Sequence, residues 1–268
     1  MTMSMKYRSL VPILAAGMLL AVPAMVTSPQ AAAFAQSSTS DSNLKAEIMN
    51  KALNKSQFKD IQVQVQNGVV TLTGTVNNVA VKEQADHRVH GTKGVQAVDN
   101  QIQIAGPSVP DSELQQKLVK AIEYSRVGYG TTAFNAISVS VQNGVVTLGG
   151  HAYGPVDADT AVNIAQNTKG VQDVIDNIQV DPVSPNDDRI RRAEYRSIYG
   201  FPSLNKYAID PAQPIRISVQ NGNVTLYGSV DSQSDKNAAG IRANTVPGVF
   251  HVTNDLQVAG QRPEQTQR

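Results

Sequence analysis

The sequence predicts an α+β protein built from three tandem copies of one small unit, each with the order helix–strand–strand–helix–strand. Three observations lead to this prediction: one segment occurs three times, glycines follow it at constant spacing, and apolar residues at helical spacing flank it. Each unit is expected to fold as a three-stranded mixed sheet with two helices on one face.

The repeated segment reads IQVQVQNGVVTLTG from Ile61, ISVSVQNGVVTLGG from Ile137 and IRISVQNGNVTLYG from Ile215, at intervals of 76 and 78 residues. Nine glycines occupy matching positions in the turn, at the end of the segment and before the last strand. We expect them to serve backbone geometry rather than ligand binding, because glycine enters conformations closed to other residues. They are Gly68, Gly74, Gly94, Gly144, Gly150, Gly170, Gly222, Gly228 and Gly248.

The first copy shows how each element is predicted. Ile61, Val63 and Val65 alternate with polar residues, which is the period of a half-buried strand. The Asn-Gly pair that follows predicts a tight hairpin turn, since both turn residues must adopt positive φ. Apolar residues four apart, among them Ala85 and Val89, then predict a helix over residues 79–90, and a last strand follows.

A further helix is expected before each hairpin. Apolar stripes predict it over 44–53 in the first unit and 114–122 in the second, and a shorter, arginine-rich helix over 188–197 in the third. Proline-bearing linkers at 106–110 and 181–185 predict units with limited mutual contact. The expected units are therefore 43–105, 111–181 and 187–259, followed by a flexible tail over 260–268.

The N-terminus has the pattern of a secretory signal peptide. Lys6 and Arg8 precede an apolar run over residues 10–26, and Ala33-Phe34-Ala35 forms a small-x-small cleavage signature. An uncleaved membrane anchor is the alternative, but two prolines within the run and the cleavage signature favour cleavage. The sequence predicts a signal peptide over 1–35, a flexible leader over 36–42, and export to the periplasm or out of the cell.

Composition narrows the function classes. The absence of cysteine excludes disulfides, thiolate metal sites, a cysteine nucleophile and a lipobox anchor. A net charge of +1 argues against nucleic-acid binding, which needs a cationic surplus. His87 and His90 share a helical face, but no third ligand recurs nearby, so no metal site is expected. No phosphate loop or nucleophile motif is present, which predicts a protein that is not an enzyme and binds no cofactor. After signal cleavage, no membrane-spanning segment is expected.

Each unit resembles a BON domain, the small α/β module of bacterial osmotic-shock and lipid-associated envelope proteins. The resemblance rests on the Val-x-Asn-Gly-x-Val-x-Leu-x-Gly hairpin, the helix after it and the Gly-Val before the last strand, and covers about residues 43–258. It implies an envelope protein that binds anionic phospholipid surfaces or other envelope components without chemistry. Two departures are the missing lipobox cysteine, which implies reversible membrane contact, and a longer connection over residues 199–214 in the third copy.

Basic residues beside aromatic rings suit a phospholipid headgroup interface, because guanidinium groups pair with phosphate and rings insert at the acyl boundary. A solvated helix face, balanced by Asp187, Asp188 and Glu194, is the alternative. The second unit, rich in acidic residues, is expected to bind lipid least. The candidate lipid-binding residues are Arg189, Arg191, Arg192, Arg196, Tyr199 and Phe201 in the third unit, and Lys51 and Lys55 in the first.

Two functional hypotheses therefore stay open. The first is a peripheral protein that docks reversibly on anionic phospholipid. The second is a soluble periplasmic osmotic-stress protein or chaperone-like scaffold that contacts other proteins.

Overall fold

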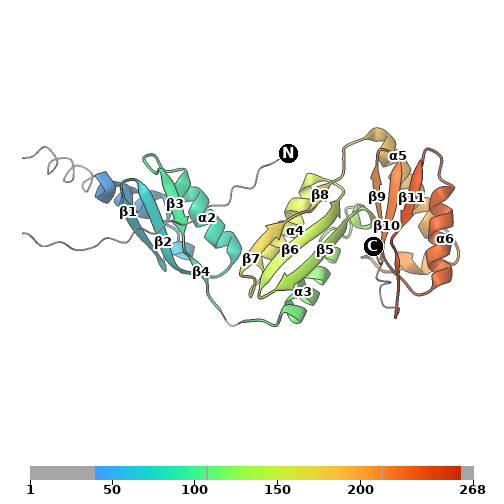
Figure 1. The fold of residues 1–268 in the computed structure, drawn as a ribbon, viewed down its shortest axis with the longest axis horizontal. Helices are drawn as coiled ribbons and strands as arrows, with labels where there is room; N and C mark the ends of the chain where they lie inside the picture. Colours follow the sequence, from blue (N-terminus) through green and yellow to red (C-terminus); the bar gives the residue numbers. More distant parts are fainter. Residues whose placement is uncertain (1–39, 107, 213, 261–268) are drawn as a thin grey trace, which may run out of the picture.

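The structure, a computed structural model, describes residues 40–106, 108–212 and 214–260, which form three α+β units in succession (Figure 1). The expected signal peptide over 1–35, the leader residues 36–39 and the tail from residue 261 lie outside the described residues. Among the described helices, none is long and apolar enough to cross a membrane.

The first unit begins with an α-helix over the described residues 40–47, which continues as a π-helical turn. The expected leader over 36–42 is wrong at its end, because residues 40–42 already belong to this helix. The elements are η1 (Ile48–Ala52), η2 (Ser56–Phe58), β1 (Ile61–Gln66), β2 (Val69–Val76), α2 (Val79–His90), β3 (Ala97–Asn100) and β4 (Gln103–Ile104).

The second and third units repeat this order with full-length first helices. The helices α3 and α5 have 15 residues each, so the expectation of a shorter helix in the third unit is wrong. The second unit contains α3 (Asp111–Ser125), η3 (Thr132–Phe134), β5 (Ala136–Gln142), β6 (Val145–Ala152), α4 (Pro155–Asn167), β7 (Asp173–Asp176) and β8 (Gln179–Val180). The third contains α5 (Pro185–Tyr199), η4 (Asn205–Ala208), β9 (Ile215–Gln220), β10 (Asn223–Val230), α6 (Gln233–Asn244), β11 (His251–Asn254) and β12 (Gln257–Val258).

Each sheet is mixed, which confirms the predicted topology. The central strand, which is β2, β6 or β10, pairs antiparallel with the strand before it and parallel with the last strand. The last strand is interrupted once in each unit and is therefore divided into two short pieces that pair with the same neighbour. In the second unit α3 and α4 lie together on one face of the sheet (Figure 1).

The hairpin turns have the predicted backbone geometry. Asn67, Asn143 and Asn221 have φ of 51–52°, and the glycine after each has φ of 76–77°. Two consecutive residues with positive φ define the tight hairpin turn that matches the twist of the strands. The glycine six residues later, Gly74 in the first unit, also has positive φ, and a Cβ there would collide with the carbonyl oxygen of Asp60.

An aspartate at the start of each first helix holds the hairpin turn. The Asp111 carboxylate accepts hydrogen bonds from the backbone N–H of Asn143 at 2.7 Å and of Gly144 at 2.9 Å. The same pair of bonds joins Asp41 to the first turn and Asp187 to the third. We call this contact the aspartate–turn bond; it fixes where each first helix begins on its sheet.

The first two units meet at their second helices. Val79, the first residue of α2, is buried with the core residues of the second unit, and the Gln166 side chain on α4 donates a hydrogen bond to Glu83 at 2.6 Å. This contact is small beside the one between the second and third units.

Substitution of Asp111 by alanine tests the aspartate–turn bond. We expect unfolding free energy to fall by about 1–3 kcal/mol, because two charge-assisted bonds to a turn are lost together. Asp111→Asn, which keeps one acceptor oxygen, should lose less, and Glu113→Ala, an exposed change in the same helical turn, should stay within about 0.5 kcal/mol. Urea denaturation measures all three; equal stability of Asp111→Ala and Glu113→Ala would contradict the assigned role.

Candidate functional site on the third unit

Helix α5 carries most of the candidate residues, and the structure divides them between its two faces. The helix starts at the cap residue Ser184, whose hydroxyl accepts from the Asp187 N–H at 3.2 Å, and Pro185 occupies its first turn. Its buried stripe contains charged residues beside aliphatic ones, namely Asp187, Ile190, Arg191, Glu194, Ile198 and Tyr199. Arg189, Arg192 and Arg196 are exposed.

Arg191 is only 1% exposed and joins the second and third units. Its guanidinium donates to Asp188 at 2.7 Å, to the Val219 carbonyl at 2.6 Å and to Asp181 at 3.3 Å. The group also lies 5.2 Å from the ring centre of Tyr153. The expectation that Arg191 contacts a lipid headgroup is therefore wrong, since protein groups enclose its charge.

Asp181 is the acceptor at the centre of this joint. It follows β8 in the proline-bearing linker and is 1% exposed. Besides Arg191, it accepts from the Ser218 hydroxyl at 3.0 Å and from the Gln220 amide at 2.9 Å, and His151 Nδ1 lies 3.2 Å from it. The linker thus ties the second and third units together, and the prediction of limited contact between these two is wrong.

A second group of contacts lies at the η3 end of the joint. Phe134 packs among core residues of the third unit, 6.3 Å from the ring centre of Tyr195. Arg216 on β9 donates to the Thr132 carbonyl at 2.6 Å, and its other nitrogen lies 3.8 Å from Glu123. Burial lowers the pKa of Arg216, and partial burial raises that of Glu123, whose side chain is still 44% exposed.

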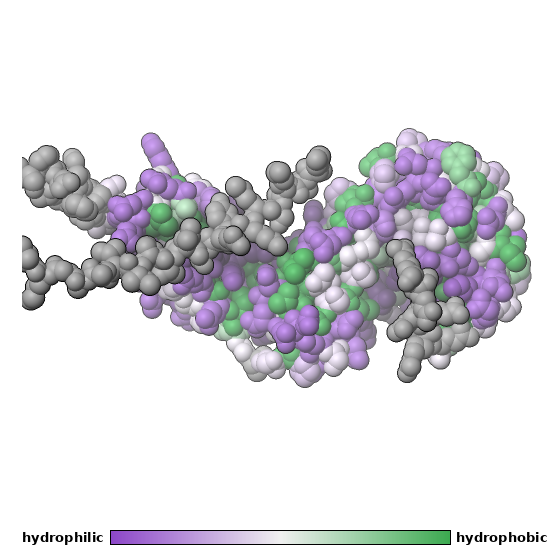
Figure 2. All heavy atoms as spheres, in the orientation of Figure 1, coloured by the Kyte–Doolittle hydropathy of each residue, from purple (hydrophilic) through white to green (hydrophobic). Residues whose placement is uncertain are grey.

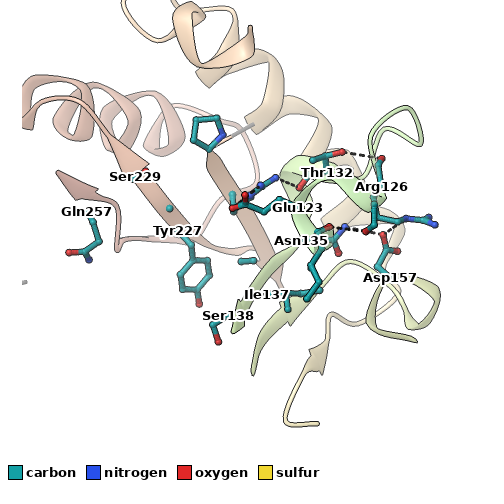
Figure 3. A pocket seen from close by; sticks show the side chains of 16 residues that line it. Glu123, Arg126, Thr132, Asn135, Ile137, Ser138, Asp157, Tyr227, Ser229 and Gln257 are labelled. Carbon is teal, nitrogen blue, oxygen red and sulfur yellow. Dashed lines mark hydrogen bonds and ion pairs between the residues drawn. The ribbon is translucent and has the colours of Figure 1, made fainter. Parts of the chain in front are cut away.

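A cleft of about 430 Å³ opens beside these contacts, between β5 of the second unit and β10 of the third (Figure 3). Its charged groups are already paired: Arg126 lies 2.9 Å from Asp157, which also accepts from Thr131 and Asn135. These bonds connect the loop after α3 to the start of α4. Within the described ranges, no cluster of three or more potential ligands is placed to hold a metal ion.

Tyr199 and Phe201 are also held by protein. The Tyr199 hydroxyl donates to the Ile215 carbonyl at 2.6 Å and accepts from the Ile215 N–H at 3.2 Å, and burial raises the pKa of Tyr199. Phe201 is half-buried with the Arg242 guanidinium 5.2 Å from its ring centre. The expectation that Tyr199 inserts into a lipid surface is wrong because its ring belongs to the core.

Three arginines remain on the outer face of α5. Arg189, Arg192 and Arg196 lie three and four residues apart, so they form one exposed row along the helix, which we call the arginine row. Among the residues that the structure describes, no carboxylate lies within 4.0 Å of their guanidinium nitrogens. Visible surfaces of the second and third units otherwise mix hydrophilic and hydrophobic side chains (Figure 2).

The acidic residues expected to balance this row are engaged elsewhere. Asp187 holds the hairpin turn, and Asp188 pairs with Arg191. Glu194 is fully buried, and burial raises its pKa to about 8, so it is mostly uncharged at pH 7. The arginine row therefore keeps its positive charge unbalanced.

Exposed apolar side chains lie near both ends of the row. Arg189 reaches the backbone of Gly248, two residues before Phe250, which is 79% exposed. At the other end, Arg242 donates to the Ser197 carbonyl at 3.2 Å, and its neighbour Ile241 is 66% exposed.

The lysines of the first unit do not form a comparable row. Lys51 is exposed and pairs with Glu47 at 2.9 Å. The helix ends at Leu53, and Lys55 lies in extended backbone before η2. Lys51 and Lys55 therefore do not share a helical face, because the helix ends before Lys55.

Sequence reasoning missed the joint and the role of Glu194. Asp181, Ser218 and Arg216 carry no local motif, and their partners lie far along the chain. The sequence did contain a signal for Glu194. When the three first helices are aligned, Glu194 occupies the position that holds the apolar residues Ile48 and Leu118 in the other two units.

These features define a class of protein: tandem α+β modules with one shared hairpin framework and divergent surfaces. The chain belongs to the BON domain family, whose model matches residues 40–106, 110–182 and 203–260. The third match begins after α5. We assign α5 to the third unit because Asp187 holds the third hairpin.

Two curated proteins are similar in sequence. Osmotically-inducible protein Y of Escherichia coli (strain K12) is 27% identical over 199 residues, which is 70% of this chain and 92% of that protein. The 21 kDa hemolysin of Actinobacillus pleuropneumoniae is 28% identical over 116 residues, 43% of this chain and 59% of that protein. Among solved structures, the C-terminal domain of CdsD, a structural protein of the Chlamydia trachomatis type III secretion system, matches with 14% identity and a TM-score of 0.22, covering 80% of this chain and 96% of that one.

Substitution of Arg191 by methionine tests the buried joint. We expect a loss of about 3–5 kcal/mol in unfolding free energy, because Asp181 is left buried without its cation. Arg192→Met, one residue further along on the exposed face, should change stability by less than about 0.5 kcal/mol.

Guanidinium denaturation measures this difference, and adding Asp181→Asn should recover part of the loss. Similar stabilities of Arg191→Met and Arg192→Met would contradict the role of Arg191 in the joint.

Proposed function

We propose that this protein is an exported, non-catalytic envelope protein that associates reversibly with anionic phospholipid surfaces through the arginine row of α5. The observation that carries the proposal is the row itself, three exposed guanidiniums without a neighbouring carboxylate in the described part of the chain. Exposed Phe250 and Ile241 near the ends of the row support it, because rings and aliphatic side chains can enter the acyl boundary beside bound headgroups.

The size of the effect suits reversible binding. A basic residue near an anionic membrane contributes about 1 kcal/mol, so three give an attraction that salt can release. Arginine also forms paired hydrogen bonds with phosphate oxygens, which favours it over lysine at this position. Membership of the BON family and the signal-like N-terminus are consistent with this setting in the cell envelope.

Vesicle cosedimentation of the exported, purified protein tests the proposal. We expect binding to phosphatidylglycerol vesicles, falling as salt rises, and little binding to phosphatidylcholine vesicles. Arg192→Glu with Arg196→Glu should weaken binding at least about tenfold, since four units of charge change on one face. Arg191 is left intact because it belongs to the fold.

The matched control is Lys117→Glu with Lys120→Glu, which makes the same charge change on exposed residues of the sister helix α3. This variant should bind nearly as the natural protein does. Equal binding to phosphatidylglycerol and phosphatidylcholine vesicles would rule out the arginine row as the binding surface. An equal loss of vesicle binding in both double variants would also rule it out.

A soluble osmotic-stress protein that contacts other envelope proteins is a second candidate. Similarity to a protein named as osmotically inducible, over most of that protein's length, favours it. Recovery of no protein partner from envelope extracts, together with no effect on aggregation of unfolded proteins, would count against it.

A further inference from the structure

The core of the third unit contains a carboxyl group without a partner. Glu194 is 0% exposed, and within the described part of the chain neither of its carboxylate oxygens has a hydrogen-bond partner. A buried ionised carboxylate without pairing is so unfavourable that the group holds its proton or moves to water. An unsatisfied carboxyl in a helix that packs on the core therefore requires an explanation.

The other two units show what this position normally holds. The aspartate–turn bond aligns the three first helices, and the seventh residue after the aspartate is Ile48, Leu118 and Glu194 in turn. Ile48 and Leu118 are both 0% exposed core residues. The third unit thus places an ionisable group where the same fold elsewhere uses an aliphatic side chain.

Among the described residues, no charged group pairs with Glu194. Helix α5 packs against β9, α6 and η4. Most ionisable side chains of these elements have other partners: Arg216 bonds to Thr132, Arg242 to Ser197, and Lys206 and Tyr207 to Asp235. Lys236 on α6 is half-buried and forms no ion pair with Glu194. On α5 itself, Tyr199 is bound as described above, and Arg191 bonds to Asp188, Asp181 and Val219 through its two terminal nitrogens. The buried Nε of Arg191 has no hydrogen-bond partner among the described residues and does not bond to Glu194. Burial is the one cause that raises the pKa of Glu194 to about 8.

We propose that Glu194 is a proton-operated switch that seats helix α5 on the third unit when protonated and releases it when ionised. Because Arg191 lies on the same helix, release of α5 also opens the joint with Asp181 and the second unit. The switch concerns the packing of α5 and does not depend on what the arginine row binds.

The direction of the pH dependence follows from proton linkage. The seated helix keeps a proton that a solvated glutamate releases above its ordinary pKa of 4.5. Seating is therefore strongest at low pH and weakens as pH rises, by about tenfold in the seating equilibrium for each pH unit. The change ends once pH passes about 8, where both states have lost the proton.

Hydrogen exchange on the full exported chain tests the switch, with α3 as an internal reference because it carries Leu118 at the same position. From pH 5.5 to 9, after correction for intrinsic exchange rates, protection of α5 relative to α3 should fall by about tenfold per pH unit and level off above about pH 8. Glu194→Gln and Glu194→Leu should make the ratio independent of pH, and Glu194→Leu should raise protection at pH 8.

The converse change, Leu118→Glu, should transfer the pH dependence to α3. If that variant does not fold at neutral pH, the comparison of the natural chain with Glu194→Gln decides alone, since it leaves every other titrating group in place. A natural chain whose ratio does not change with pH, or a Glu194→Leu variant that keeps the dependence, would overturn the proposal.

Discussion

The bond between the aspartate of each first helix and the Asn-Gly turn sets the arrangement of all three units. A turn with two positive-φ residues presents adjacent N–H groups, and one carboxylate accepts both of them. Once that contact is made, residues three, seven and eleven positions later must face the sheet, as Leu114, Leu118 and Ile122 do in the second unit. The same register buries Ile190, Glu194 and Ile198 in the third unit, although one of them is ionisable.

The local framework was predictable because its signals are short in range. Strand alternation, the Asn-Gly pair and the helical spacing after the hairpin involve residues within a few positions of one another, and the mixed three-stranded topology followed from them. The aspartate–turn bond was not predictable in this way, since Asp111 and its turn lie 32 residues apart. The search for apolar residues at helical spacing also gave a helix that is too short at α5, because the buried stripe of this helix contains the charged residues Arg191 and Glu194.

Predictions of the site failed where composition was used to infer exposure. Proline in the linker at 181–185 indicates a stiff backbone, but it says nothing about the partners of Asp181. Four arginines in eight residues suggested one basic surface. The helix turns about 100° per residue, which places Arg191 about 100° or more around the helix from Arg189, Arg192 and Arg196 and buries it. Buried arginine is uncommon, so its charge is explained only by Asp181 and Asp188, which the fold brings to it.

The three units use one scaffold but differ in which surface stays open. The outward side chains of β1 and β5, such as Gln62 and Ser138, are exposed, whereas Arg216 and Ser218 at the matching positions of β9 are buried against the second unit. One face of the sheet of the third unit is therefore covered by the second unit, while Arg189, Arg192 and Arg196 on α5 stay exposed. The acidic residues of α5 act inside the fold: Asp187 binds the hairpin turn, Asp188 pairs with Arg191, and Glu194 is buried. The arginine row faces outward, so its positive charge is left unbalanced.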